Sequence, residues 1–140
     1  MSTVLAFDYG ERFVGVAVGD VETALANPLT HIEARGSAPR LAAIEAMVRE
    51  WRPGRLVVGL PLSLDGKPHA MTAKAQAFGA ELAEHFALPV EYCDERLSSA
   101  AAEENLRAAG RGGRANKHLV HAEAARIILQ DWLDHAKHAA

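Results

Sequence analysis

Three acids and one histidine have the types and positions needed for chemistry on a phosphate group. Asp8 ends the first apolar run of the chain, and Asp94 and Glu95 end a later alternating segment. His121 lies in a long segment with helical spacing near the C-terminus. A carboxylate at the end of a buried strand must be solvated, paired or bound to a cation, because an uncompensated buried charge is costly. The pattern therefore predicts a cation site built from residues far apart in the sequence.

Each of these residues also has an ordinary structural explanation. Asp8 could cap the turn that follows it by accepting hydrogen bonds from backbone N–H groups. The two adjacent acids could form ion pairs with Arg96 or Arg12, and His121 could be a hydrogen-bonded histidine at a helix start. Taken singly, the residues favour a functional role for Asp8 and a structural one for His121.

The elements that must position these residues begin with a hairpin. The run that ends at Asp8 is apolar on both faces, which is typical of a central strand covered on both sides. The run that follows has valines on one face and Gly15, Ala17 and Gly19 on the other. Because that second face is small, another segment can approach it closely. The three residues between the two runs, 10–12, are enough for a tight turn.

The spacing of apolar residues predicts the remaining elements. We expect a weak third strand over 26–34, a helix over 39–51, a strand over 55–61, a helix from about 71 to 86, a strand over 90–95, a short alanine-rich helix ending at 110 and a last helix over about 118–135. The last helix aligns His121, Ala125, Ile128 and Trp132 on one face, which places the histidine on the inward stripe.

This order of elements predicts one domain, 1–140, of the α/β class, with a mixed five-stranded sheet and helices on both faces. Right-handed crossovers make the first, fourth and fifth strands parallel neighbours, so their carboxyl ends share one edge. That edge would carry Asp8, Asp94 and Glu95, and the last helix would bring His121 to it.

The chemistry that this group could perform is metal-assisted hydrolysis. Mg²⁺ takes one or two protein carboxylates and keeps water and phosphate ligands, a requirement that Asp8 with Glu95 or Asp94 would meet. A metal ion held there could activate a water and neutralise the charge that develops on a phosphodiester. His121 could act as a ligand, a proton carrier or an orienting group.

A glycine-rich basic segment, 110–117, precedes the last helix. Its cations and backbone N–H groups could contact phosphates, although a solvated surface loop is the default interpretation. The cations are Arg111, Arg114 and Lys117 within the segment and Arg107 just before it. Cys93 has no evident activating base and is expected in the core, and the histidines other than His121 show no metal-ligand spacing, so they receive no role.

Composition excludes several classes of protein. The hydrophobic fraction of 49% and the charged fraction of 24% are typical of a soluble globular domain, and no apolar run approaches the length of a membrane span. The net charge of -3 argues against a general nucleic-acid coat protein. A single cysteine excludes an internal disulfide, and the start of the chain shows no leader, so we expect a cytoplasmic protein.

Four motifs in one order resemble the YqgF/RuvX family of the ribonuclease H-like superfamily. They are 5–10 with 14–18, 57–62 with Asp65-Gly66, 94–98, and Asn116-Lys117 before the last helix. The resemblance covers nearly the whole chain. It implies a ribonuclease H-like fold, a bacterial cytoplasmic protein, and a metal-dependent endonuclease that processes the 5′ end of pre-16S rRNA in ribosome biogenesis.

The resemblance also assigns site residues by position. Asp8 matches the first metal ligand and Glu95 the second acid, with Asp94 as an adjacent candidate ligand, whereas His121 stands where the family has an aspartate. Histidine can ligate softer divalent metals but removes one negative charge from a Mg²⁺ site. The change therefore implies a preference for Mn²⁺, a slower enzyme, or binding without catalysis. Glu123 lies about 200° round the helix from the histidine and is a poor substitute.

The expected activity is that of a divalent-metal nuclease on structured RNA, with Mg²⁺ or Mn²⁺ as cofactor. Cations that would steer phosphate are Arg96, Arg111, Arg114 and Lys117. Two alternatives stay open: a Holliday junction resolvase, which would normally require a dimer, and a noncatalytic RNA-binding factor in ribosome assembly. A nucleotide-binding fragment of the acetate-kinase or actin type is disfavoured, because the chain is short for that two-domain design, and measurable ATP binding would be needed to support it. The sequence leaves open whether the protein is a monomer or a homodimer.

Overall fold

The computed structural model describes residues 3–61, 70–94 and 117–139, with side chains in the last segment from 120 to 136. Its elements are β1 (Thr3–Tyr9), β2 (Phe13–Asp20), β3 (Leu25–Glu33), α1 (Ser37–Trp51), β4 (Arg55–Leu60), α2 (Ala70–Phe86), β5 (Val90–Asp94) and α4 (Lys117–Ala139). Each strand and helix predicted within the described ranges is present. The predicted short helix that ends at 110 lies outside these ranges, and so does the predicted glycine-rich segment 110–117 except for its last residue, which begins α4.

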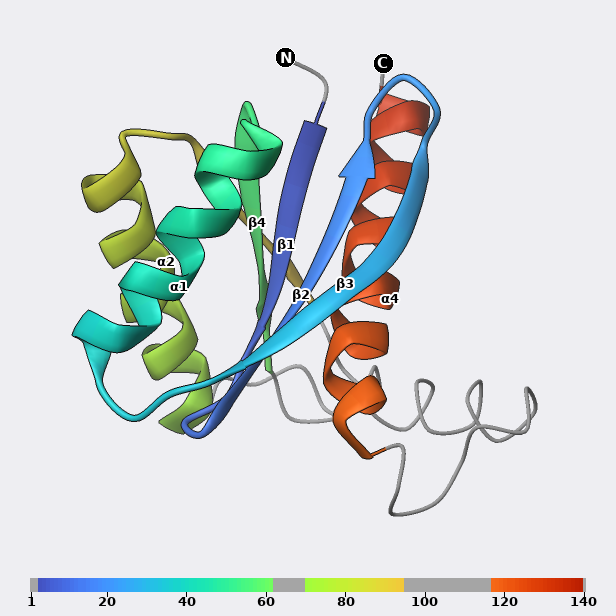
Figure 1. Cartoon of the computed structure of the whole chain (residues 1–140). Coiled ribbons are helices and arrows are strands. Elements are labelled where there is room, and N and C mark those ends of the chain that lie inside the picture. Colours follow the sequence, from blue (N-terminus) through green and yellow to red (C-terminus); the bar gives the residue numbers. More distant parts are fainter. Residues whose placement is uncertain (1–2, 62–69, 95–116, 140) are drawn as a thin grey trace.

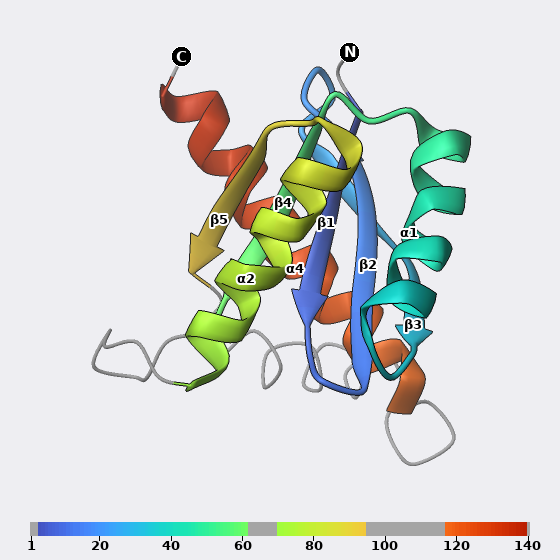
Figure 2. The same ribbon diagram turned by 90° about the vertical axis from the view of Figure 1, so that its left-hand side faces the viewer.

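The five strands form one mixed sheet in the order β3-β2-β1-β4-β5. The β1/β2 and β2/β3 pairs are antiparallel, whereas β1/β4 and β4/β5 are parallel. Helices α1 and α2 cover one face of the sheet and α4 covers the other (Figures 1 and 2). The predicted fold class and the parallel relation of the first, fourth and fifth strands are therefore confirmed.

Strand β1 is the centre of both halves of the core. Val4, Leu5, Ala6 and Phe7 are each at most 1% exposed. Alternate side chains point to opposite faces of a strand, so β1 contributes to two separate apolar clusters. One cluster, with α1 and α2, includes Leu5, Phe7, Ile44, Phe78 and Leu82, and the other, with α4, includes Val4, Ala6, Ala125, Ile128 and Leu129. This arrangement explains the continuous apolar run at the start of the sequence.

Strand β3 is an edge strand, which explains its weak sequence signal. It contains Pro28, which lacks an N–H group and is tolerated in sheets mainly at edges and bulges. Its register against β2 shifts between Val16 and Ala17. Leu25, at its start, is 62% exposed. Because one side of the strand is solvated, apolar alternation is incomplete and the sequence pattern is correspondingly poor.

Helix ends differ slightly from the prediction. Helix α1 begins at Ser37, two residues before Pro39, and stops at Trp51 because Arg52 adopts the left-handed conformation, with φ of 48°. The apolar residues Leu41, Ile44, Val48 and Trp51 recur at helical spacing in the sequence, which predicts Trp51 on the inward stripe of this helix, but its side chain is 37% exposed. That expectation is wrong because the last turn of the helix extends past the sheet cluster, which α1 enters mainly through the buried Ile44.

Within the described segments, no helix has both the length and the apolar character that crossing a bilayer requires.

The contact between β2 and α4 is unusually close at Gly15. A Cβ atom added to Gly15 would overlap the backbone carbonyl oxygen of His121. Four residues further on, a Cβ at Gly19 would lie 2.9 Å from a methyl group of Leu129. The small face of β2 is therefore the surface on which α4 packs, as its glycines and alanine predicted.

We predict that Gly15→Ala destabilises the fold by about 3 kcal/mol, because the new methyl group meets backbone that can move only with the whole helix. The free energy of unfolding from urea denaturation measures the loss. Gly79→Ala is the matched control: its new methyl group meets the end of the Tyr92 side chain, which can shift. Equal losses in the two variants would show that α4 adjusts easily and that the contact at Gly15 is not special.

Candidate functional site

The candidate site lies at the carboxyl end of β1, on the face covered by α4. Asp8 is paired in register with Gly15 of β2, which is paired in turn with His31 of β3. Asp8 shares its face with Val4 and Ala6, which pack against α4. The three paired residues thus form one row across the sheet, and the glycine leaves the space between Asp8 and His31 open to the helix above.

His121 of α4 occupies that space. Its imidazole stacks on the ring of Phe13, with centroids 4.7 Å apart and planes inclined by 18°. The His31 ring lies 6.1 Å from it, centroid to centroid. His31 and Phe13 are themselves 5.6 Å apart. The prediction that His121 faces inward at the start of the last helix is therefore confirmed, and its ring is held by an aromatic partner.

Burial lowers the pKa of His121 below its usual value. The negative charge of Asp8 opposes this by raising the pKa, and His31 lowers it further. The geometry agrees with these effects: the His121 backbone lies over Gly15, the residue paired with Asp8, and the His31 ring is 6.1 Å from the His121 ring. A neutral imidazole keeps one nitrogen lone pair, so His121 can accept a proton or ligate a metal ion.

At the end of β5, neighbouring side chains point to opposite faces of the sheet. The Tyr92 hydroxyl donates a hydrogen bond to the Gln76 carbonyl of α2, 3.0 Å away, whereas the Cys93 Sγ lies 3.5 Å from a carboxylate oxygen of Asp131 on α4. Asp94 follows by alternation on the α2 side and is exposed, so the fold does not bring it to the face of Asp8. Cys93 is half-buried against the α4 cluster, as expected of a packing residue.

Several predicted residues are outside the described ranges. Glu95, Arg96, Arg111 and Arg114 belong to this group, and so does the side chain of Lys117, the first residue of α4. Two other points from the sequence can be judged nevertheless: the possible ion pair of the acids with Arg12, and Glu123 as a substitute ligand for His121. Arg12 pairs with Glu33 of β3, at 3.2 Å, rather than with Asp94. Glu123 receives two hydrogen bonds from Arg126, of 2.6 and 2.8 Å, which supports its dismissal as a substitute ligand.

The described residues do not supply a complete set of metal ligands. Among them, no group of three or more His, Cys, Asp and Glu side chains could hold a metal ion. Asp8 and His121 supply one oxygen and one nitrogen donor on the same face, a set that suits divalent transition metals better than Mg²⁺. This partial set fits a metal site if an acid from beyond β5 completes it.

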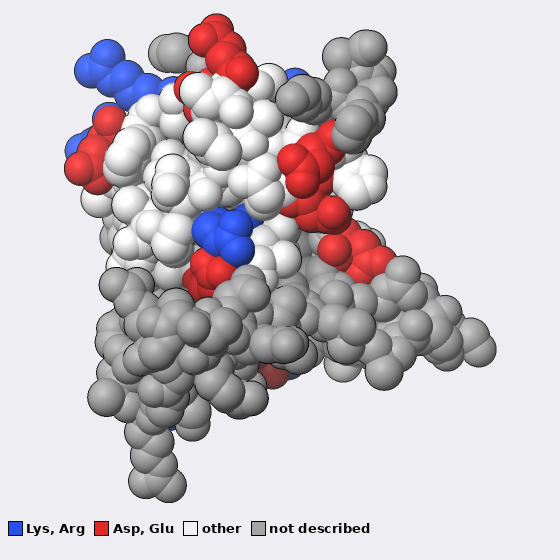
Figure 3. Space-filling view, turned by 90° about the vertical axis from the view of Figure 1, so that its right-hand side faces the viewer, with Lys and Arg blue, Asp and Glu red and all other residues white. Residues whose placement is uncertain are grey.

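The described outer surface around α4 is more acidic than basic. Figure 3 shows this side of the molecule, where acidic groups are more extensive than basic ones on the described surface. Between residues 120 and 136 the helix carries three acids and one arginine: Glu123, Asp131, Asp134 and Arg126. This excess of negative charge disfavours the approach of phosphates across this part of α4.

His31 and Phe13 are the site residues that the sequence did not reveal. His31 received no role because it has no metal-ligand spacing to another histidine. Its neighbours across the sheet depend on the register of β3, which the weak pattern of that strand could not supply. The sequence feature that pointed to this place was Gly15, because a glycine in the middle of a strand indicates close approach by another segment.

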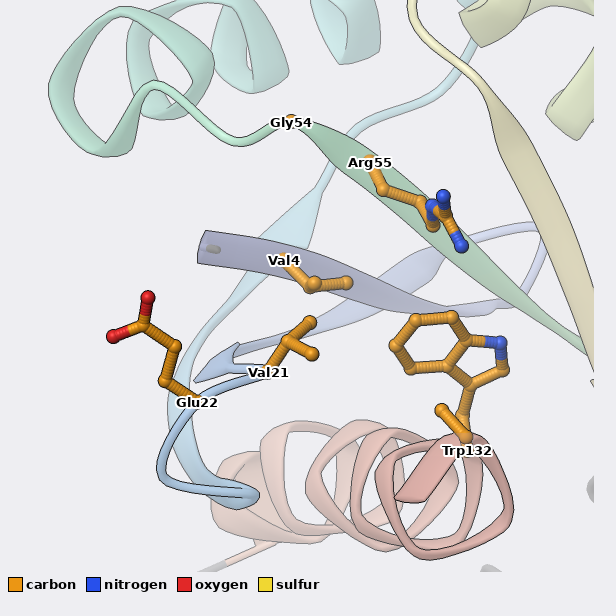
Figure 4. A pocket seen from close by; sticks show the side chains of 7 residues that line it. Val4, Val21, Glu22, Gly54, Arg55 and Trp132 are labelled. Carbon is orange, nitrogen blue, oxygen red and sulfur yellow. The ribbon is translucent and has the colours of Figure 1, made fainter. Parts of the chain in front are cut away.

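A separate cavity of about 450 Å³ lies at the opposite end of the sheet, where β1 and β4 begin (Figure 4). Val4, Val21 and Trp132 form apolar walls, and the Arg55 guanidinium lies 5.6 Å from the centre of the Trp132 ring. No predicted site residue lines this cavity. It is therefore distinct from the edge that carries Asp8.

The depressed pKa of His121 predicts a pH-dependent stability. The folded state disfavours the protonated His121 ring. The contribution of His121 to the free energy of unfolding is therefore fully present above the unfolded-state pKa near 6.5, and it is lost as the pH falls below that value. We expect His121→Asn to weaken the loss of unfolding free energy on acidification, measured by urea denaturation across this range.

His135 provides a comparison of opposite sign. The Asp131 carbonyl and then its carboxylate raise the pKa of His135, so that stabilisation is present below 6.5 and lost as the pH rises. His135→Asn should therefore change the profile on the alkaline side of 6.5. If the free energy of unfolding of His121→Asn fell below pH 6.5 as steeply as that of the wild type, burial would not be lowering the pKa of His121.

Residues 2–135 match the RuvX family, whose description is Holliday junction resolvase. A protein of Dechloromonas aromatica (strain RCB), named "Putative pre-16S rRNA nuclease", is 50% identical over 138 residues, covering 99% of this chain and 94% of that protein. A protein of the same name from Burkholderia lata is 49% identical over 133 residues, covering 95% of this chain and 89% of its own. These similarities extend over almost the full length of each sequence.

The fold is also found in solved structures of RuvC. T. thermophilus RuvC in complex with Holliday junction substrate superposes with a TM-score of 0.58 and 18% identity, covering 100% of this chain and 98% of that one. A second Thermus thermophilus RuvC structure gives a TM-score of 0.56, also at 18% identity, covering 97% and 96%. At this identity the likeness establishes the ribonuclease H-like fold alone. From its sequence matches, the chain belongs to the RuvX family.

Proposed function

We propose that this protein is a divalent-metal-dependent endonuclease that processes the 5′ end of pre-16S rRNA in the bacterial cytoplasm. The observation that carries the proposal is the placement of His121 over Gly15, the residue paired with Asp8, at the carboxyl edge of parallel strands. Family membership and the names of the relatives support hydrolysis of a phosphodiester in RNA.

Three residues would form the site. Asp8 supplies a carboxylate from the centre of the sheet, and His121 supplies a neutral imidazole that Phe13 keeps in place. Glu95 is the proposed third ligand because Cys93 faces α4 and the sequence predicts that Glu95 shares its face. Asp94 is the less favourable choice, since it lies on the α2 side.

A Mg²⁺ or Mn²⁺ ion held by these residues would supply a Lewis acid for the scissile phosphate and lower the pKa of an attacking water. The protein's own contribution is positional. Asp8 follows four fully buried residues of β1, which fix its position, and the stacked ring of His121 can accept a proton at an orientation set by α4.

Substrate contacts would come from Arg96, Arg111, Arg114 and Lys117, which flank the proposed site in sequence. Cations bind RNA phosphates without base specificity, so their role would be to increase affinity and to orient the strand. This local positive charge would offset the net charge of -3 of the whole chain. For cleavage of a single RNA strand, one copy of the chain would suffice.

Cleavage of a pre-16S rRNA 5′-leader fragment tests the proposal. With purified protein we expect cutting in Mn²⁺, weaker cutting in Mg²⁺, and none with chelator. Asp8→Asn should reduce the rate about 100-fold or more, because a charged group that stabilises the reacting phosphate is lost. His121→Asp should raise the rate in Mg²⁺ by restoring a carboxylate.

Matched variants make the assay specific. Asp134→Asn removes the same charge from the exposed side of α4 and should leave the rate unchanged. Glu95→Gln should act like Asp8→Asn, whereas Asp94→Asn should have little effect. Cutting that survives Asp8→Asn would point to a contaminating nuclease, and RNA binding without cutting in either metal would favour an assembly factor.

A second candidate is resolution of branched DNA, because the family description names Holliday junctions. Symmetric cutting of a four-way junction requires two active sites related by a two-fold axis. Sedimentation velocity and a junction-cleavage assay separate the two functions: a homodimer that cuts paired strands would support resolution, and a monomer that cuts only RNA would oppose it.

A further inference from the structure

A second cavity, of about 200 Å³, lies between α1, α2 and the end of β1 on the face opposite Asp8. Tyr9, Ser37, Arg40, Lys74, Ala77, Phe78 and Glu81 line it. A water molecule occupies about 30 Å³ in the liquid, so the cavity has room for several waters or for a phosphate group. Its lining includes two cations, Arg40 and Lys74.

Arg40 is the buried charged side chain of the described residues, with only 8% of its surface exposed. Its guanidinium lies over the rings of Tyr9 and Phe78, at 5.1 and 5.9 Å from their centres. Its one hydrogen bond in the described structure is a long one, 3.4 Å, from Nη2 to the Glu11 carbonyl. The aromatic faces therefore orient the cation, but they only partly replace its lost hydration.

The Arg40 side chain has no anionic partner among the described residues. Its Nε is buried and without a hydrogen-bond partner. No ion pair joins the guanidinium to a carboxylate in the part of the chain that the structure describes. A buried, unpaired charge is costly, and an orphaned buried donor often marks the place of a water or an ion. The Arg40 side chain also lines the cavity, which has room for an anion.

Lys74 brings a second cation to the same cavity. Its ammonium group lies 2.8 Å from the Glu11 carboxylate, and both side chains are about half exposed or more. Such an exposed pair is weak, so a phosphate could replace or share the carboxylate at little cost. Glu81 also lines the cavity and keeps its negative charge, because its hydrogen-bond partner, the Ser37 hydroxyl, is neutral. A phosphate would therefore need both Arg40 and Lys74 to outweigh this carboxylate.

The position of the cavity relates it to the proposed active site. Tyr9, whose ring packs under Arg40, directly follows Asp8 in β1, so the two side chains point to opposite faces of the sheet at the same edge. A strand of RNA that passes round this edge with one phosphate at Asp8 would bring a neighbouring phosphate towards Arg40. The fork of guanidinium donors suits the oxygens of a phosphate.

We propose that Arg40 and Lys74 form a second phosphate site, which holds a backbone phosphate of the RNA away from the scissile bond. The role assigned to RNA rests on the proposed nuclease function, whereas the anion site itself does not. Bound there, a phosphodiester would give the buried guanidinium its missing partner and would fix the strand on the side of the sheet away from α4.

Inorganic phosphate tests the anion site without any nuclease activity. In protein with nitrogen-15 arginine, the Nε–H resonance of Arg40 is identified by its absence in Arg40→Met. We expect this resonance to shift saturably with phosphate, and the shift to be lost in Lys74→Gln. No shift in the wild-type protein would overturn the site, whatever the outcome of cleavage assays.

RNA binding by the Asp8→Asn protein tests the proposed occupant separately from cleavage. We expect Arg40→Met to weaken affinity for the leader RNA about tenfold, since a charged hydrogen bond is lost. Lys74→Gln should reduce the slope of log affinity against log salt by about 0.7, the value for one phosphate contact of a single strand. The matched control is Arg49→Met, which removes an exposed cation from the same helix and should leave affinity within about twofold.

The stability of Arg40→Met decides between a binding and a structural role. Because the cation is buried without a carboxylate, its replacement by an apolar side chain should leave the melting temperature unchanged or raise it. A lowered melting temperature with unchanged RNA affinity would show that the arginine serves packing and would overturn the proposal. A phosphate-induced shift with RNA affinity unchanged would assign the site to free phosphate and would equally overturn the role in RNA binding.

Discussion

The backbone contact between β2 and α4 at Gly15 is the constraint on which the arrangement of the site depends. It lets the helix lie against the sheet without a side chain between them, so that the His121 ring comes next to Phe13 and within electrostatic range of Asp8. A larger residue would separate the two layers at the row of residues that forms the site. The stability of the fold and the geometry of the candidate site therefore depend on the same glycine, because the close approach that completes the core also places the imidazole.

Much of the fold could be predicted because its central elements are the most regular ones. The double-sided apolar run of β1, the small face of β2 and the helical stripe through Ala125 and Ile128 each follow from burial. Prediction was weaker where burial is one-sided or incomplete. The edge strand β3, with its proline and its register shift, has little alternation, and Trp51 at the end of α1 lies beyond the cluster that its helical phase suggested.

The candidate site was only partly accessible to sequence analysis, for physical reasons that differ between residues. Asp8 and His121 end or begin elements whose direction is fixed by the core, so their meeting could be inferred. His31 depends on strand register, which no local pattern encodes. Arg40 lies on the inward side of α1 among aliphatic residues, and its burial depends on rings from β1 and α2, so only the packed structure reveals it.

The two faces of the sheet differ in charge, and this difference bears on the histidine at position 121. Burial favours the neutral form of His121, so the Asp8 side carries less negative charge than a site of three carboxylates would. A metal ion bound at the proposed site would be held less tightly for this reason, but a polyanion would also be repelled less. The acidic outer surface of α4 still discourages approach from that side, whereas Arg40 and Lys74 offer positive charge across the same edge. An RNA strand guided by this difference would reach Asp8 from the α1 and α2 side, along the edge where the parallel strands end.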